Sequence, residues 1–275
     1  MDVLYIIIVR IFQGFTLIKV VVAVAMVVGL SVLAERVSTR FAGVVSGFPL
    51  GAAIVLFFIG YEIGPAFAGQ SAIYTVFGLI GTLAFVLGYY LMTVALGGRA
   101  GPAPAFCSAL GGLALYFAAA FLLQFFKIGL AGAVISTSSA IVAATILFRR
   151  LQNVRIERPL SLGLWLLILR AFFAAGVITL ITASARLVGP GWAGLLSAFP
   201  MTMLPFLFII HATYRTEHVW SIIKNVPRGI GAIVVYGVVV AAVYPRHGIW
   251  LGTLEGYLAA TLYLLVLLIP VGRRS

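Results

Sequence analysis

Two basic side chains, Lys19 and Arg170, interrupt long apolar runs of the sequence. Each lies about eight to ten residues inside its run, which on a helix is a depth of roughly 12–15 Å. A cation at the centre of a membrane helix costs about 2.5–3.5 kcal/mol on insertion scales, so it usually faces a cavity or a partner. The alternative is snorkelling, in which the long stem carries the charge toward the membrane surface. We predict a functional role for both cations, as ligands of an anion.

A short motif, Ser-x-Phe-Pro, occurs twice and is the second feature that could bind a ligand. Residues 42–49 read AGVVSGFP and residues 193–200 read AGLLSAFP. Proline removes a backbone donor and displaces the carbonyl four residues earlier. A discontinuous helix at this point would present N–H groups and its positive dipole end to an anion near the midplane. A simple proline kink is the alternative. The predicted substrate-binding residues are Lys19, Arg170, Ser46, Pro49, Ser197 and Pro200.

One acidic residue, Glu255, lies within a late apolar run. We predict that it either neutralises Lys19 or Arg170, or couples transport to protons. The alternative is a carboxylate at the membrane surface, solvated from outside.

The sequence lacks the residues that several kinds of chemistry require. The only cysteine is Cys107, and His211, His218 and His247 lack a metal-ligand spacing, so we expect no metal and no cofactor. No P-loop, H-E-x-x-H or Asp-rich prenyl-transfer motif occurs, and we expect no enzyme.

The composition defines the elements that must position these residues. Of 275 residues, 63% are hydrophobic and 9% charged, with a mean hydropathy of +1.21. This excludes a soluble fold, a disordered chain and a disulfide scaffold. Continuous apolar runs, each about the 20 residues that cross a bilayer, predict an all-α polytopic membrane protein. The expected spans are 12–34, 41–60, 71–96, 104–126, 128–148, 161–185, 192–211, 219–244 and 248–270, with the membrane part of the eighth beginning near Gly229.

Charge in the loops predicts the orientation. The loops on one side, together with the C-terminus, hold ten basic residues, and the loops on the other side hold three. The positive side is expected to be cytoplasmic, which places the N-terminus outside and the C-terminus inside, in a plasma membrane, with a prokaryotic inner membrane favoured. The net charge of +12 is therefore a topology signal, and we expect no nucleic-acid partner.

The two motif copies extend to an internal repeat. At an offset of 151, Lys19 aligns with Arg170, and spans 1–4 correspond to spans 6–9. Five crossings separate equivalent helices, so the two repeats must be inverted, as in many secondary transporters. The expected units are repeat 1 (1–126), a connector helix and cytoplasmic loop (127–160) and repeat 2 (161–275).

The C-terminal half resembles the GlpM-like family of small membrane proteins. The resemblance covers about residues 165–270 and lies in Arg170, the segment 193–200 and His211. The N-terminal half matches through Lys19 and residues 42–49, with Gly60 in place of the histidine. The resemblance implies that a four-helix half can exist alone and pair with itself, which makes a homodimer a candidate assembly. It implies no substrate.

Together these features predict a transporter or facilitator for an anionic small molecule or lipid headgroup, bound near the midplane between the repeats. A membrane scaffold in envelope or polysaccharide assembly and an anion channel are the alternatives. The expected partners are membrane lipid and the anionic solute.

Overall fold

A computed structural model describes residues 18, 19, 21, 22, 24, 25, 48–154 and 164–268. The element order over this part of the chain is α4, α5, α6, α7, α8, α9 and α10, with no strand. Their bounds are Leu50–Glu62, Pro65–Ala95, Pro102–Leu123, Leu130–Phe148, Leu164–Ser197, Met203–Thr213 and Thr216–Leu268.

Five of the described helices, α5, α6, α7, α8 and α10, are long and apolar enough to cross a membrane. Helices α4 and α9 are apolar but shorter. This confirms an all-helical chain consistent with a membrane protein. The nine spans and the two inverted repeats are not established by this part of the chain.

Two of the long helices contain a break at glycine. Gly189 (φ 79°) interrupts α8 directly before Pro190, and Gly248 (φ 78°) interrupts α10. Side chains with a Cβ rarely adopt this backbone conformation, so glycine suits both positions. The predicted span 192–211 was wrong as one helix, because its residues are divided between the end of α8 and α9. The expected spans 219–244 and 248–270 fall within α10, on either side of its break at Gly248.

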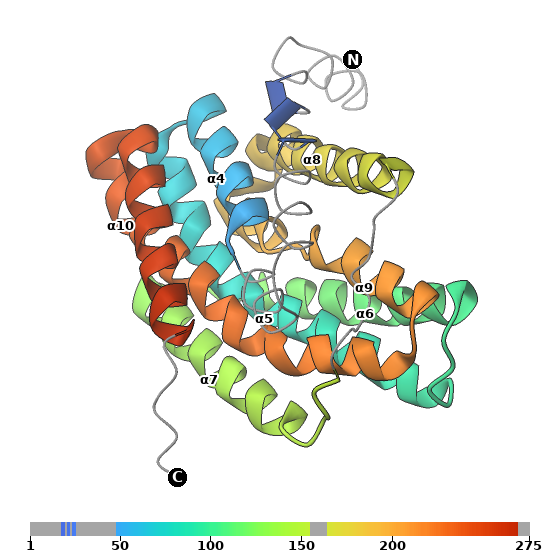
Figure 1. The fold of residues 1–275 in the computed structure, drawn as a ribbon. Helices are drawn as coiled ribbons and strands as arrows, with labels where there is room; N and C mark the ends of the chain where they lie inside the picture. Colours follow the sequence, from blue (N-terminus) through green and yellow to red (C-terminus); the bar gives the residue numbers. More distant parts are fainter. Residues whose placement is uncertain (1–17, 20, 23, 26–47, 155–163, 269–275) are drawn as a thin grey trace.

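Helix α5 runs through the middle of the bundle and packs against α4, α6, α7, α8 and α10 (Figure 1). In its most apolar window 72% of the residues are buried, against 11% for the peripheral α7. Small residues allow the close contacts: a side chain at Gly194 of α8 would overlap the Ser71 carbonyl of α5. The fold is therefore organised around α5, against which the end of α8 is fixed.

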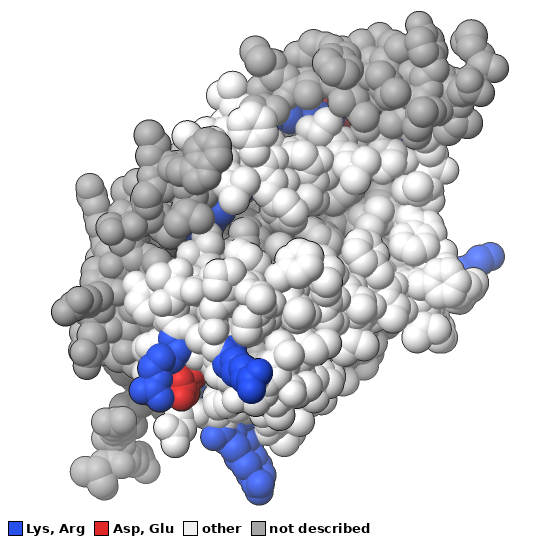
Figure 2. Space-filling view, turned by 90° about the vertical axis from the view of Figure 1, so that its right-hand side faces the viewer, with Lys and Arg blue, Asp and Glu red and all other residues white. Residues whose placement is uncertain are grey.

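The outer faces of α6 and α7 carry exposed large apolar side chains, including Phe106, Phe121, Ile135 and Ile146. On the face drawn in Figure 2 most of the described surface carries no charge, and the Lys and Arg side chains in view gather mainly toward its lower end. An apolar surface of this extent is suited to contact with lipid tails.

Candidate functional site

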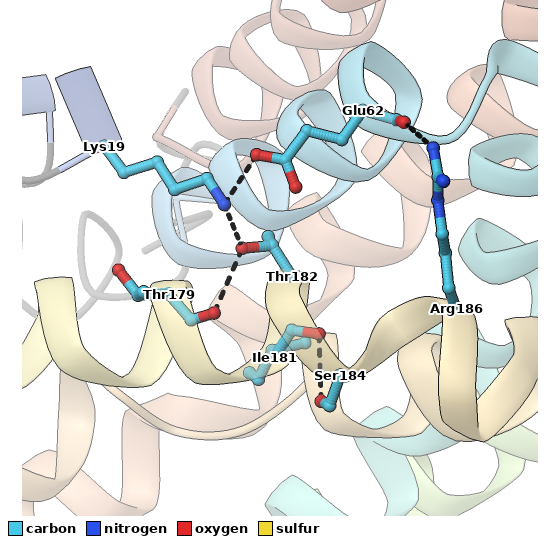
Figure 3. A network of polar contacts seen from close by, with 7 residues as sticks. All are labelled: Lys19, Glu62, Thr179, Ile181, Thr182, Ser184 and Arg186. Atoms are coloured by element: carbon cyan, nitrogen blue, oxygen red, sulfur yellow. Dashed lines mark hydrogen bonds and ion pairs between the residues drawn. The ribbon is translucent and has the colours of Figure 1, made fainter. Parts of the chain in front are cut away.

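The described residues contain a buried ion pair between Lys19 and Glu62. The Lys19 Nζ atom lies 2.6 Å from Glu62 Oε1, and the two side chains are 6% and 25% exposed. Glu62 is the last residue of α4, and its carboxylate points back along the end of that helix toward Lys19 (Figure 3). Lys19 therefore faces a charged partner within the chain, and this partner, Glu62, was not predicted.

Three further contacts stabilise the charge on Lys19. Its ammonium donates a hydrogen bond to Thr182 Oγ1 at 2.6 Å, and the Thr182 hydroxyl donates to the Thr179 carbonyl at 3.2 Å. The ammonium also lies 5.6 Å from the centre of the Phe58 ring, a cation–π distance. Finally, the C-terminal end of α4 carries a partial negative charge that favours a nearby cation. Lys19 is thus held in place by groups of both α4 and α8.

Arg186 completes this cluster from one turn further along α8 than Thr182. Its guanidinium donates a hydrogen bond to the backbone carbonyl of Glu62. The last carbonyls of a helix have no partner within the helix, so the bond satisfies one of them. Glu62 therefore contacts one cation through its side chain and a second through its backbone (Figure 3).

The helical residues near Lys19 run antiparallel to α8. Lys19 contacts Thr182, whereas Val24 packs against Ala171 and Ala174, so rising numbers on one segment meet falling numbers on the other. This packing brings the early cation to the C-terminal half of α8, and it places Lys19 beside the end of α4.

Glu255 does not neutralise either predicted cation. Its Oε1 atom lies 3.0 Å from His247 Nδ1, and both side chains are exposed, at 40% and 52%. The break at Gly248 lies between these two residues and turns the chain, which brings them together locally. The prediction of Glu255 as the counter-charge of Lys19 was wrong, because Glu62 occupies that position.

The second Ser-x-Phe-Pro motif interrupts a helix rather than bending it. Helix α8 ends at Ser197, Pro200 is buried in the gap, and α9 begins at Met203. In the first half, Pro49 is buried directly before α4, which begins at Leu50. Ser46 lies outside the described residues. Pro49 therefore directly precedes the short apolar helix α4, and Pro200 lies three residues before the short apolar helix α9.

Hydroxyl groups of the first half bind the carbonyls that the second break exposes. Thr82 of α5 donates to the Ala198 carbonyl at 2.6 Å, and Tyr116 of α6 donates to the Leu195 carbonyl at 2.8 Å. Ser197 donates within its own helix, to the Ala193 carbonyl. Its hydroxyl proton is therefore engaged in this structure.

The two breaks lie against each other. A Cβ atom at Gly51, two residues after Pro49, would lie 3.1 Å from the Met201 side chain, which directly follows Pro200. Gly51 belongs to the first turn of α4, and Met201 lies two residues before α9. The Met201 side chain therefore links the first turn of α4 to the break before α9.

Arg170 lies beside the second break, on α8. Its guanidinium carbon is 6.0 Å from the centre of the Phe206 ring, in the first turn of α9. One turn further along α8, the Phe173 ring lies 6.5 Å from the ring of Phe199, which precedes Pro200. The structure thus brings Arg170, Pro200 and the start of α4 into one region.

Lys19 lies apart from this region. Twelve residues of α8 separate its partner Thr182 from Arg170, which corresponds to about 18 Å along a helix. The 13 residues of α4 separate Pro49 from Glu62 by about 20 Å. The residues predicted to form one site therefore form two separate sites. The central site contains Arg170 and the two prolines, and the peripheral site contains Lys19.

His211 is fully buried, although it lies at the end of the predicted span 192–211. Its Nε2 atom donates to the Arg99 carbonyl at 2.9 Å, and its Nδ1 atom lies 3.2 Å from the Tyr89 hydroxyl. These bonds attach α9 to α5 and to the loop that precedes α6. The described residues contain no cluster of three or more His, Cys, Asp or Glu side chains that could hold a metal.

Comparison of the chain with protein-family models, with curated proteins and with solved structures found no match. The resemblance to the GlpM-like family stays a prediction.

Proposed function

We propose that this chain is an integral membrane transporter or facilitator for an anionic small molecule or lipid headgroup. The observation that carries the proposal is the contact between the Met201 side chain, at the break before α9, and Gly51, in the first turn of α4. The start of a helix carries a partial positive charge that favours an anion, and each of these two breaks directly precedes the start of a helix. Arg170 lies beside the same break, with its guanidinium carbon 6.0 Å from the centre of the Phe206 ring.

The substrate would bind between these two breaks, with Arg170 as its charged partner. Discontinuous helices that meet near the midplane are the usual binding architecture of secondary transporters. Thr82 and Tyr116 keep the break open in apolar surroundings, because they satisfy carbonyls that a continuous helix would bind itself. They are positioning residues for the proposed site.

The inverted repeat is part of the proposal. In both halves a short helix follows the Ser-x-Phe-Pro motif, and a long helix follows after a turn: α4 and α5 in one half, α9 and α10 in the other. The segment around Lys19 runs antiparallel to α8, the helix that carries its sequence counterpart Arg170. Rocking of the two halves about the central breaks would give alternating access, with the N-terminus outside and the C-terminus in the cytoplasm of a prokaryotic cell.

Uptake into proteoliposomes tests the function. The purified chain is reconstituted and offered a panel of radiolabelled carboxylates, phosphates and sulfonates, with and without a pH gradient. We expect uptake of one class, with loss in Arg170→Met and retention in Arg246→Met, whose side chain is exposed. A folded Lys19→Met, Arg170→Met double variant that transports normally refutes the proposal.

A membrane scaffold is the second candidate. It is favoured by the fact that Lys19 already has three partners, which fasten its segment to α4 and α8. A scaffold predicts no uptake for any anion. An anion channel predicts flux that follows the membrane potential and is indifferent to a pH gradient.

A further inference from the structure

The two members of the Lys19–Glu62 pair differ in their exposure. The Lys19 side chain is 6% exposed, whereas the Glu62 side chain is 25% exposed. A buried ammonium without a counter-ion is strongly unfavourable, so Lys19 in its charged form requires an anion beside it. Glu62 can leave at lower cost, because its carboxylate is one-quarter exposed at the end of α4.

We propose that Lys19 is an anion-binding site in its own right, and that the Glu62 carboxylate occupies it in this structure as an internal substitute. An incoming small carboxylate would displace Glu62 and take its position 2.6 Å from Lys19 Nζ. The chemical class follows from the present occupant, which is itself a carboxylate bound through one oxygen atom. This site does not depend on the central one, from which about 20 Å of α4 separates it.

The surroundings of Lys19 can stay in place during this exchange. Thr182 orients the ammonium, and its own hydroxyl is fixed by the Thr179 carbonyl. The Phe58 ring lies against the same ammonium. None of these contacts involves the Glu62 carboxylate, so only one acidic side chain has to rotate away.

Arg186 favours the same exchange. It holds the backbone carbonyl of Glu62, so α4 remains attached to α8 when the side chain leaves. Its side chain is exposed, and its charged guanidinium lies beside Glu62. Lys19 and Arg186 against one carboxylate give the cluster a net charge of +1, which attracts an incoming anion.

Binding of acetate to the full chain in detergent tests this inference without any transport measurement. The bulky sulfonate anion of the buffer is replaced stepwise by acetate at constant ionic strength. The midpoint of thermal unfolding is measured at each acetate concentration. In the wild type Glu62 competes as an intramolecular ligand, at an effective concentration in the millimolar range or above. We expect Glu62→Gln to bind acetate at least about ten-fold more tightly than the wild type, because this competitor is gone.

The controls separate this site from general anion effects. Glu255→Gln removes the carboxylate of the exposed His247 pair and should leave the acetate response unchanged. The Lys19→Met, Glu62→Gln double variant should lose the response.

If Glu62→Gln does not fold, Glu62→Asp gives the same test, since its shorter carboxylate pairs less well. Equal acetate affinity in wild type and the Glu62 variant, or a response that survives loss of Lys19, overturns the inference. Failed uptake with intact acetate binding would refute only the transport proposal.

Discussion

The unequal exposure of Lys19 and Glu62 predicts that removing either partner has unequal effects on stability. Glu62→Gln leaves an ammonium that is almost fully buried without its counter-charge. Lys19→Met leaves a carboxylate that is one-quarter exposed and can turn toward water. The apolar side chain of Met also suits the surroundings that the Lys19 stem already occupies.

The expected magnitudes follow from the general behaviour of buried pairs. Removing one partner of a buried pair destabilises by about 3–5 kcal/mol. We expect about 3 kcal/mol for Glu62→Gln, because Thr182 and Phe58 still contact the ammonium. For Lys19→Met we expect about 1 kcal/mol, because water solvates the remaining carboxylate. The double variant should lose about 1 kcal/mol or less, since a neutral replacement of a buried pair is often tolerated.

The assay is the free energy of unfolding in mixed micelles, with a bulky sulfonate as the only anion so that no small ligand replaces Glu62. The double-mutant cycle then gives a coupling of about 3 kcal/mol between the two positions. Glu255→Gln is the matched control and should change stability by less than about 0.5 kcal/mol, because its pair is exposed. A larger loss for Lys19→Met than for Glu62→Gln, or additive effects, would refute the reasoning.

Two further substitutions test the packing that positions the central site. Thr82→Val removes the donor to the Ala198 carbonyl and should reduce the free energy of unfolding, measured in the same micelles, by about 1–2 kcal/mol. An unchanged free energy of unfolding contradicts the role of this bond. Gly194→Ala would force a methyl group against the Ser71 carbonyl and should cost about 1–3 kcal/mol. Gly191→Ala is its control, because nothing lies closer than 3.8 Å to a Cβ there, and equal losses in both would exclude the clash as the cause.

The sequence predicted the long helices of the middle of the chain well. The expected spans 71–96, 104–126 and 128–148 correspond to α5, α6 and α7, with a shift of six residues at the start of α5 and of three or fewer elsewhere. Continuous apolar runs are a strong local signal, and Pro65 and Pro102 mark the first turns of α5 and α6. These boundaries depend on neighbouring residues only, and local sequence could therefore predict them.

The nature of the proline break could not be predicted in the same way. The motif indicated either a kink or a break, and partners far away in the sequence stabilise the break at Pro200. Thr82 is 116 residues from Ala198, and Tyr116 is 79 residues from Leu195. Such contacts depend on how α5 and α6 pack against α8, which no local pattern specifies.

Glu62 was missed because it lies two residues beyond the predicted span 41–60 and was assigned to a loop. A signal for it was present. Only six acidic residues occur in the chain, and a buried lysine needs one of them. In two consecutive antiparallel spans, a residue near the start of the first lies beside the end of the second. That geometry favours Glu62 over Glu255 as the partner of Lys19.

Helix α4 gives the two proposed anion sites a common element. Its first turn contacts Met201 at the central break, and its last residue forms the ion pair with Lys19. A helix of this length moves as a nearly rigid body, so a change in its tilt at one end displaces the other. Because Arg186 keeps α4 attached to α8 when the Glu62 side chain leaves, exchange at Lys19 does not require such a change of tilt. We therefore expect the two sites to bind anions independently, without the reciprocal change in affinity that coupled sites show.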